Sequence, residues 1–302
     1  QQVSSAASDV YKRQVLYLSL FLTLHMDKRI NLNKEVWSAR ALNTAPDSEN
    51  QIHGDDMARE FGFRGGLVPG VTVSAYLLHP IIEKWGIDWL EKGWAKCKIT
   101  SPLYDKEDFS IFLDEISQSE IISILKNSKQ SITANAEARL LKIIPKTPKI
   151  RGDKIAAQNF QGPKASKNVW MKLKKDGCMA FEYFWGGKDP LIYLKDQDAL
   201  PDLLNPSKKG FSNLSFLLGC SNWILASNAY MNPWIHLQTT SQNYQALPYN
   251  SSVIAEIQIN EVFEKKGHEF VDVEVNLFKK EDESCVMNIN LLSIYKVRGS
   301  KD

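Results

Sequence analysis

The sequence lacks the features that mark several common classes of protein. Its 302 residues include only four cysteines, and the formal net charge is +2. The cysteines stand far apart with no C-x-x-C pair, which argues against structural zinc and a disulfide framework. Reduced, buried thiols in a cytoplasmic protein are expected instead. A net charge this small provides no overall field for binding nucleic acid or a membrane surface. The length suits one large or two medium globular domains.

The sequence also lacks an apolar run long enough to cross a bilayer. "VLYLSLFLTLH", which ends at His25, is too short, because a spanning helix needs roughly 20 apolar residues. Lys12 and Arg13 precede this run, but no small-residue cleavage site follows it, so a secretory signal is not expected. The preceding "SSAASDVYKRQ" resembles a translated sequencing-adapter scar. We therefore expect residues 1–25 to be an adapter-derived or untranslated extension and the native protein to begin at Met26.

The sequence contains an internal repeat, in which one pattern of residues occurs twice. "WAKCKITSPLY" from Trp94 and "WIHLQTTSQNY" from Trp234 share Trp, Thr, Ser and Tyr at identical spacing. Each copy continues with alternating apolar runs, which predict antiparallel strands. A long apolar helix is predicted before each copy, at residues 71–86 and 211–230. Each half therefore reads as a strand, a helix and then several antiparallel strands.

This organisation resembles the double hotdog proteins of the MaoC-like, (R)-specific enoyl-CoA hydratase group. The resemblance implies an α+β fold, a tandem (double) hotdog in which each unit is a curved antiparallel sheet wrapped around one long central helix. We expect an N-terminal hotdog with the active-site loop at residues 26–145, a basic linker at 146–175, and a non-catalytic C-terminal hotdog at 176–302. The chain would be a monomeric double hotdog or a homodimer, with the thioester site between the units.

The motif resemblance is concentrated in residues 47–70. The family motif reads D-x-N-P-[IL]-H, with an acidic residue two places further on. "SENQIHGD" matches this motif at four positions, Asn50, Ile52, His53 and Asp55. Gln51 replaces the proline, and Ser48 takes the place of the catalytic aspartate, with Asp47 one residue earlier.

The resemblance implies chemistry centred on His53. Adding water to a 2-enoyl thioester needs a base that activates the water and an acid that protonates the α-carbon, and a histidine titrates in the right range, at roughly 6.5. A neutral imidazole and a carboxylate can share one water. Asp47 would be the carboxylate if the loop shifts by one residue; otherwise Ser48 and Asn50 would only position water. Asp55 is expected to contact the substrate.

A glycine turn, "GGLVPG", precedes the first long helix. The start of a helix offers free backbone N–H groups and the positive end of the helix dipole, which suit a developing enolate oxygen. Family members usually carry His-Gly where this chain has Pro69-Gly70. The backbone groups expected to face the thioester are those of Gly66, Gly70 and Val71.

The segment 142–175 is strongly basic, with ten Lys or Arg residues against one acidic residue. It is either a solvated linker or a strap that binds the phosphates of coenzyme A or an acidic carrier protein. The lysines expected to contact such a substrate are Lys164, Lys167, Lys172 and Lys174.

Several alternatives remain open from the residues themselves. Asp, Ser and Asn in residues 47–56 are also common turn and cap residues. We interpret His79 as a core residue and His236 as a structural residue at a strand onset. The expected function is an acyl-thioester hydratase or dehydratase with neither a metal nor a redox cofactor. The alternatives are a hotdog thioesterase and a non-catalytic acyl-thioester binding protein.

Overall fold

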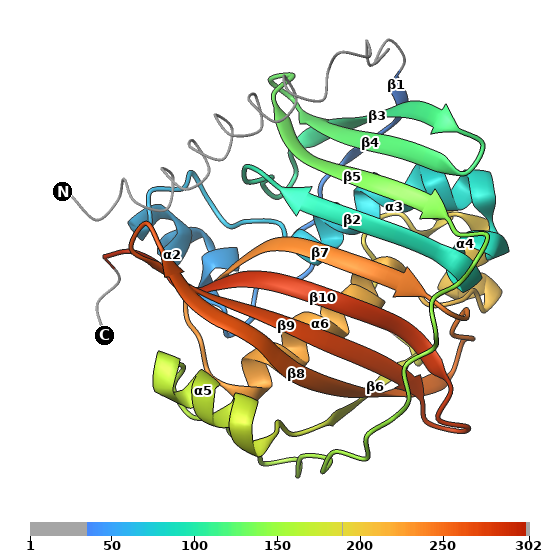
Figure 1. Ribbon diagram of the computed structural model, residues 1–302. Coiled ribbons are helices and arrows are strands. Elements are labelled where there is room, and N and C mark those ends of the chain that lie inside the picture. Colours follow the sequence, from blue (N-terminus) through green and yellow to red (C-terminus); the bar gives the residue numbers. More distant parts are fainter. Residues whose placement is uncertain (1–34, 189, 300–302) are drawn as a thin grey trace.

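One ten-stranded antiparallel sheet forms the framework of the molecule (Figure 1). The structure is a computed structural model, and it describes residues 35–188 and 190–299, so the expectations for residues 1–25 lie outside it. The strands of the first half are β1 (Glu35–Arg40), β2 (Gly93–Ile99), β3 (Asp108–Ser117), β4 (Glu120–Asn127) and β5 (Ile132–Leu140). Those of the second half are β6 (Phe181–Trp185), β7 (Ile235–Asn243), β8 (Ser251–Lys265), β9 (His268–Lys279) and β10 (Cys285–Lys296).

The sheet has the same strand order in both halves, read outward from its centre. The full order is β1-β3-β4-β5-β2-β7-β10-β9-β8-β6, so β2 and β7 form the seam between the halves. In the sequence repeat Trp94 corresponds to Trp234, and Lys98 therefore corresponds to Gln238. Lys98 and Gln238 lie directly opposite each other across the seam. A residue that pairs with its own repeat equivalent lies on a pseudo-twofold axis, so the register of the seam agrees with the register of the repeat.

Two long helices pack against one face of this sheet (Figure 1). They are α3 (Gly70–Trp85) and α6 (Leu214–Asn228), and α3 contacts α6 as well as the strands beneath it. Both are apolar nearly all round, which suits a helix with the sheet on one side and another helix beside it. The core residues Tyr76, Leu77 and Leu218 are fully buried.

The remaining helices among the described residues are short. Three are α-helical, α2 (Asp55–Glu60), α4 (Ile87–Lys92) and α5 (Lys167–Asp176). Four are single 3₁₀ turns, η1 (Gln51–His53), η2 (Gln197–Ala199), η3 (Asp202–Leu204) and η4 (Pro206–Lys208). No helix among the described residues is long and apolar enough to cross a membrane.

The linker between the halves is anchored to the sheet by a buried carboxylate. Glu256, only 1% exposed, accepts hydrogen bonds from the backbone N–H groups of Arg151, Gly152 and Asp153 at 2.8, 2.8 and 2.9 Å. Successive residues of a strand point to opposite faces of the sheet, so Glu256 points away from the face that α6 covers. The linker therefore crosses the sheet on the face opposite α6. The linker ends in α5, whose Trp170 is fully buried.

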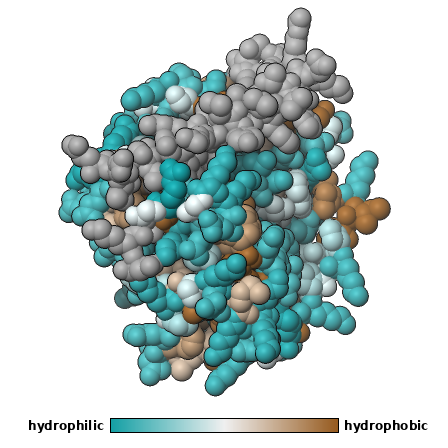
Figure 2. Space-filling view, turned by 60° about the vertical axis from the view of Figure 1, so that its left-hand side comes forward, coloured by the Kyte–Doolittle hydropathy of each residue, from teal (hydrophilic) through white to brown (hydrophobic). Residues whose placement is uncertain are grey.

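The surface and the cysteines are ordinary for a globular chain. On the side that Figure 2 shows, hydrophilic residues dominate, and hydrophobic residues reach the surface only in small separate groups. All four cysteines are free and buried, as the sequence predicted.

Candidate active site between the two halves

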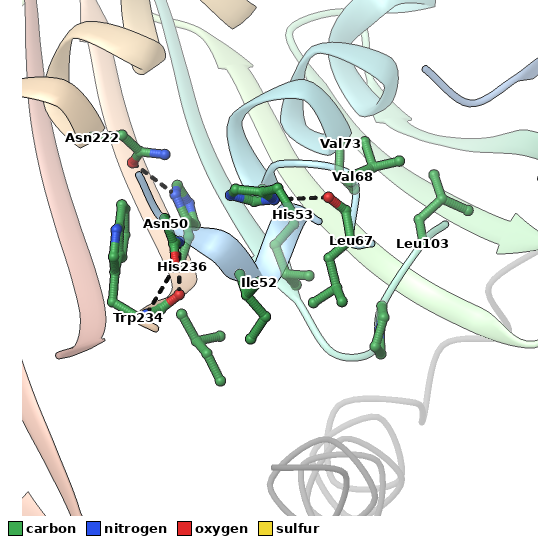
Figure 3. A pocket seen from close by; sticks show the side chains of 14 residues that line it. Asn50, Ile52, His53, Leu67, Val68, Val73, Leu103, Asn222, Trp234 and His236 are labelled. Carbon is green, nitrogen blue, oxygen red and sulfur yellow. Dashed lines mark hydrogen bonds between the residues drawn. The ribbon is translucent and has the colours of Figure 1, made fainter. Parts of the chain in front are cut away.

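A pocket opens where the first turn of α3 meets the start of β7 (Figure 3). It is lined by residues of both halves: Asn50, Ile52, His53, Leu67, Val68, Gly70, Val73, Ile99, Pro102, Leu103, Asn222, Trp234, Ile235 and His236. The lining is mostly apolar, with two imidazoles and two amides as its polar side chains. None of these residues carries a carboxylate.

His53 enters the pocket from the end of η1. Its Nδ1 lies 2.8 Å from the carbonyl oxygen of Leu67. A carbonyl oxygen can only accept, so Nδ1 carries the hydrogen, and Nε2 at the other end of the ring has a free lone pair. Burial lowers the pKa of His53 below its ordinary value. His53 is therefore a neutral base at pH 7, with its lone pair on the side toward His236 (Figure 3).

The loop that carries His53 is fastened to the second half by Asn50. The side-chain amide of Asn50 donates to the carbonyl oxygen of Trp234 at 3.0 Å, and its Oδ1 accepts from the Trp234 N–H at 3.1 Å. The N–H of Gln51 donates to the side-chain oxygen of Asn232 at 3.1 Å. The hydrogen bonds of Asn50 to Trp234 occupy both ends of its amide, which fixes the position of the loop.

The predicted carboxylate partner of His53 does not line the pocket. Asp47 is exposed, and Ser48 uses its hydroxyl to donate to the Asn50 carbonyl oxygen at 3.2 Å. Asn50 fixes this loop against Trp234, and Asp47 is not among the residues that line the pocket.

Asp55 stabilises the glycine turn. Its Oδ1 accepts from the Gly66 N–H at 2.8 Å, and its Oδ2 lies 3.1 Å from Arg59. The hydrogen bond from Gly66 lowers the pKa of Asp55. The N–H of Gly66 is therefore already engaged and is not available as a donor to a thioester.

The start of α3 is the part of the turn that reaches the pocket. Pro69 is the N-cap residue, and Gly70, the first helical residue, lines the pocket, whereas Val71 is buried and is not among the lining residues. The first N–H groups of a helix have no partner within the helix and lie at the positive end of its dipole. A Cβ at Gly70 would lie 2.8 Å from Cγ of His236, so this close approach requires glycine.

His236 lines the pocket from the second half. Its Nδ1 lies 3.1 Å from Oδ1 of Asn222 on α6, and its side chain is only 7% exposed. Burial, and secondarily the charge on His53, lowers the pKa of His236 to about 3. His236 is the second residue of β7, so the predicted position at a strand onset is confirmed. Our interpretation of it as a structural residue did not foresee that it lines the pocket. The only sequence signal was "NPWIH", which imitates the family motif after the second helix.

The basic segment lies outside the pocket. Lys164, Lys167, Lys172 and Lys174 are exposed and are not among its lining residues. The ammonium group of Lys174 donates to the carbonyl oxygen of Asn260 on β8, where α5 packs.

His79, which the sequence placed in the core, is fully buried on α3. Its Nδ1 lies 2.8 Å from the hydroxyl of Tyr193, and its ring stacks on Trp37 at 3.9 Å. Among the described residues no group of three or more His, Cys, Asp or Glu side chains is placed to hold a metal ion.

Comparison with solved structures shows which fold this is. A protein described as a MaoC domain dehydratase from Chloroflexus aurantiacus matches 88% of this chain and 94% of its own, at 7% identity and a TM-score of 0.52. A Mycobacterium tuberculosis protein with a double hotdog fold matches 87% of this chain and 97% of its own, at 8% identity and a TM-score of 0.51.

A third match is a hotdog-fold protein of unknown function from Alicyclobacillus acidocaldarius. It covers 90% of this chain and 98% of its own, at 10% identity and a TM-score of 0.50. No family model matches the sequence. No curated protein matches it either. At these identities the similarity shows the fold, and the predicted double hotdog is confirmed.

Proposed function

We propose that the chain is a MaoC-like acyl-thioester hydratase or dehydratase, acting on 2-enoyl or 3-hydroxyacyl groups carried on coenzyme A or on a carrier protein. The observation that carries the proposal is the placement of His53. A neutral imidazole with a free Nε2 lone pair lies in a mostly apolar pocket beside the first turn of α3. The dehydratase description of the structural relative from Chloroflexus aurantiacus is consistent with it.

Each part of the pocket has a task in this reaction. His53 takes a proton from water as the water oxygen adds to the β-carbon, and the resulting imidazolium gives a proton to the α-carbon. The Gly70 N–H at the start of α3 stabilises the negative charge that develops on the thioester oxygen. The apolar walls exclude bulk water and contact the acyl chain. The proposal invokes neither a metal nor a redox cofactor.

The purified protein is expected to convert crotonyl-CoA, or a longer 2-enoyl-CoA, into the 3-hydroxyacyl product. His53→Ala should abolish the conversion, because general acid–base catalysis contributes about 10²- to 10⁴-fold. The value of kcat/KM should be constant from about pH 7 to 8 and fall only on acidification below pH 6.5, since His53 works as the neutral base and its pKa is lowered. Product chromatography over this pH range measures both effects.

A buried histidine outside the pocket provides the matched control. His268, at the start of β9, accepts a hydrogen bond at Nδ1 from the Arg298 N–H at 3.0 Å, and His268→Gln should leave kcat unchanged. A hydratase that tolerates His53→Ala would contradict the role of His53.

A thioesterase is the second candidate, because a neutral His53 beside the start of α3 also suits the attack of water on a thioester carbonyl. Water activated by His53 would then attack the thioester carbonyl, and the start of α3 would stabilise the tetrahedral oxyanion. Release of free coenzyme A without any 3-hydroxyacyl product would favour this reaction. Binding of acyl-CoA with neither product would favour a non-catalytic binding protein.

A further inference from the structure

His236 presents an unpaired polar atom at the pocket. Its Nε2 is buried and has no hydrogen-bond partner among the described residues. A buried polar atom without a partner is destabilising, and such atoms in proteins are normally satisfied by a protein group, by water or by a ligand. This atom belongs to a pocket-lining residue, so a molecule in the pocket is the natural partner.

The second ring nitrogen defines what kind of partner His236 needs. Its Nδ1 lies 3.1 Å from Oδ1 of Asn222, and an amide oxygen can only accept, so Nδ1 carries the hydrogen. The Nε2 of His236 is therefore an acceptor. The same reasoning from the Leu67 carbonyl oxygen makes Nε2 of His53 an acceptor.

The two acceptors meet in the same space. The ring of His53 points away from Leu67 and toward His236, and Asn222 holds His236 from the other side (Figure 3). When His53 is protonated, its positive charge is close enough to lower the pKa of His236. Two acceptors that face one space can be joined only by a molecule with two donor hydrogens, and water is the smallest such molecule.

We propose that His236 positions the nucleophile: one water molecule donates one hydrogen to Nε2 of His236 and the other to Nε2 of His53. This role rests on the proposed hydratase function. The pair replaces the histidine and carboxylate implied by the family motif, whose aspartate position is Ser48 in this chain. The second half then supplies part of the catalytic site rather than binding surface alone.

The hydration step balances with this arrangement. The O–H bond toward His53 breaks, the oxygen forms a bond to the β-carbon, and the electron pair of the double bond moves into an enolate. The His53 imidazolium then gives its Nε2 proton to the α-carbon, so one water has been added. Throughout the step, Nε2 of His236 accepts a hydrogen bond from the remaining O–H group, and His236 stays neutral. This hydrogen bond also holds the new hydroxyl group of the product in place.

The test compares two substitutions at one position. His236→Leu fills the site without an acceptor, whereas His236→Gln keeps a side-chain oxygen near the position of Nε2. We expect His236→Leu to lower kcat for a 2-enoyl-CoA by about 100-fold, with KM within about threefold of the wild type. His236→Gln should recover at least about tenfold of that loss. Circular dichroism and the thermal midpoint report whether each variant folds.

Two kinetic outcomes would overturn the proposal. One is a His236→Leu variant with the kcat of the wild type. The other is a His236→Gln variant that is no more active than His236→Leu although both are folded, because the acceptor would then have no role.

The hydrogen positions on the rings supply a readout that does not depend on activity. In the full-length protein labelled with ¹⁵N-histidine, NMR should show His53 and His236 with the hydrogen on Nδ1. His268 should show the opposite tautomer, because its Nδ1 accepts from the backbone of Arg298. A hydrogen on Nε2 of His236 would overturn the water bridge.

The two experiments separate the two proposals. If the wild type hydrates no 2-enoyl thioester, the proposed function has failed. The tautomers of His53 and His236 then still decide whether two acceptors face the pocket.

Discussion

At the residue scale, the site depends on one missing side chain. Gly70 has no Cβ, and this lets the ring of His236 lie against the first turn of α3. An added Cβ would lie 2.8 Å from Cγ and 2.9 Å from Cδ2 of the ring, closer than atoms in proteins pack. His236 is buried, so its ring has little room to move aside. Substitutions at Gly70 and His236 should therefore have coupled effects on the free energy of unfolding.

We predict that Gly70→Ala lowers kcat at least about tenfold and destabilises the protein by about 1–3 kcal/mol, the usual cost of overpacking. The cost should largely disappear in the His236→Ala background, because the clashing ring is then gone. Urea unfolding of the wild type, both single variants and the double variant measures this coupling. Equal costs of Gly70→Ala in both backgrounds would show that the clash does not govern this position.

The residues of the site also show which contacts can be predicted from the sequence and which cannot. The register of "SENQIHGD" placed His53 and Asn50 in the loop, and both line the pocket. The sequence could not show that the side chain of Asn50 binds the backbone of Trp234, because the two residues are 184 positions apart. For the same reason the sequence could not show that His236 and His53 line one pocket.

At the scale of elements, α5 gives the basic segment a form that its composition did not predict. Ten basic residues and three prolines suggested a linker or strap. Ser166 caps a helix by accepting from the Val169 N–H, and Trp170 anchors that helix in the core. Three of the four expected lysines, Lys167, Lys172 and Lys174, are exposed along this helix, and the fourth, Lys164, is exposed just before it. None of the four forms an ion pair with a residue that the structure describes.

We predict that replacing Lys164, Lys167 and Lys172 together by Gln raises the KM for a CoA thioester. The KM for a short pantetheine thioester, which lacks the nucleotide, should change much less. Each exposed pair of opposite charges contributes only about 0–1 kcal/mol and is screened by salt, so the effect should shrink as ionic strength rises. Lys174→Gln alone is the matched control, because its ammonium group is engaged by Asn260. Equal changes for both substrates would make the segment a solvated linker.

At the scale of the whole molecule, the sequence was most informative. Alternating apolar runs predicted the strands, and the Trp-Thr-Ser-Tyr repeat predicted two equivalent units, which agrees with the pairing of Lys98 with Gln238. Such patterns are visible because burial acts on every second residue of a strand. The residues of the pocket follow no such repeating pattern in the sequence, and their contacts form only when the two halves pack together.

The two halves should unfold as one cooperative unit. They share the β2–β7 seam, the packing of α3 on α6 and the clamp of Asn50 on Trp234. Thr239 on β7 pairs with Cys97 across the seam and with Leu291 of β10 on its other side.

We predict that Thr239→Pro, which removes a ladder hydrogen bond from a central strand, costs at least about 1–3 kcal/mol and weakens both halves together. Thr239→Val keeps the strand and is the control for loss of the hydroxyl alone. Urea unfolding followed by tryptophan fluorescence and by far-UV circular dichroism should give coincident transitions for the wild type and for both variants. Two separate transitions, with Thr239→Pro shifting only one of them, would mean that each hotdog is stable without the other and that the pocket between them is assembled after folding.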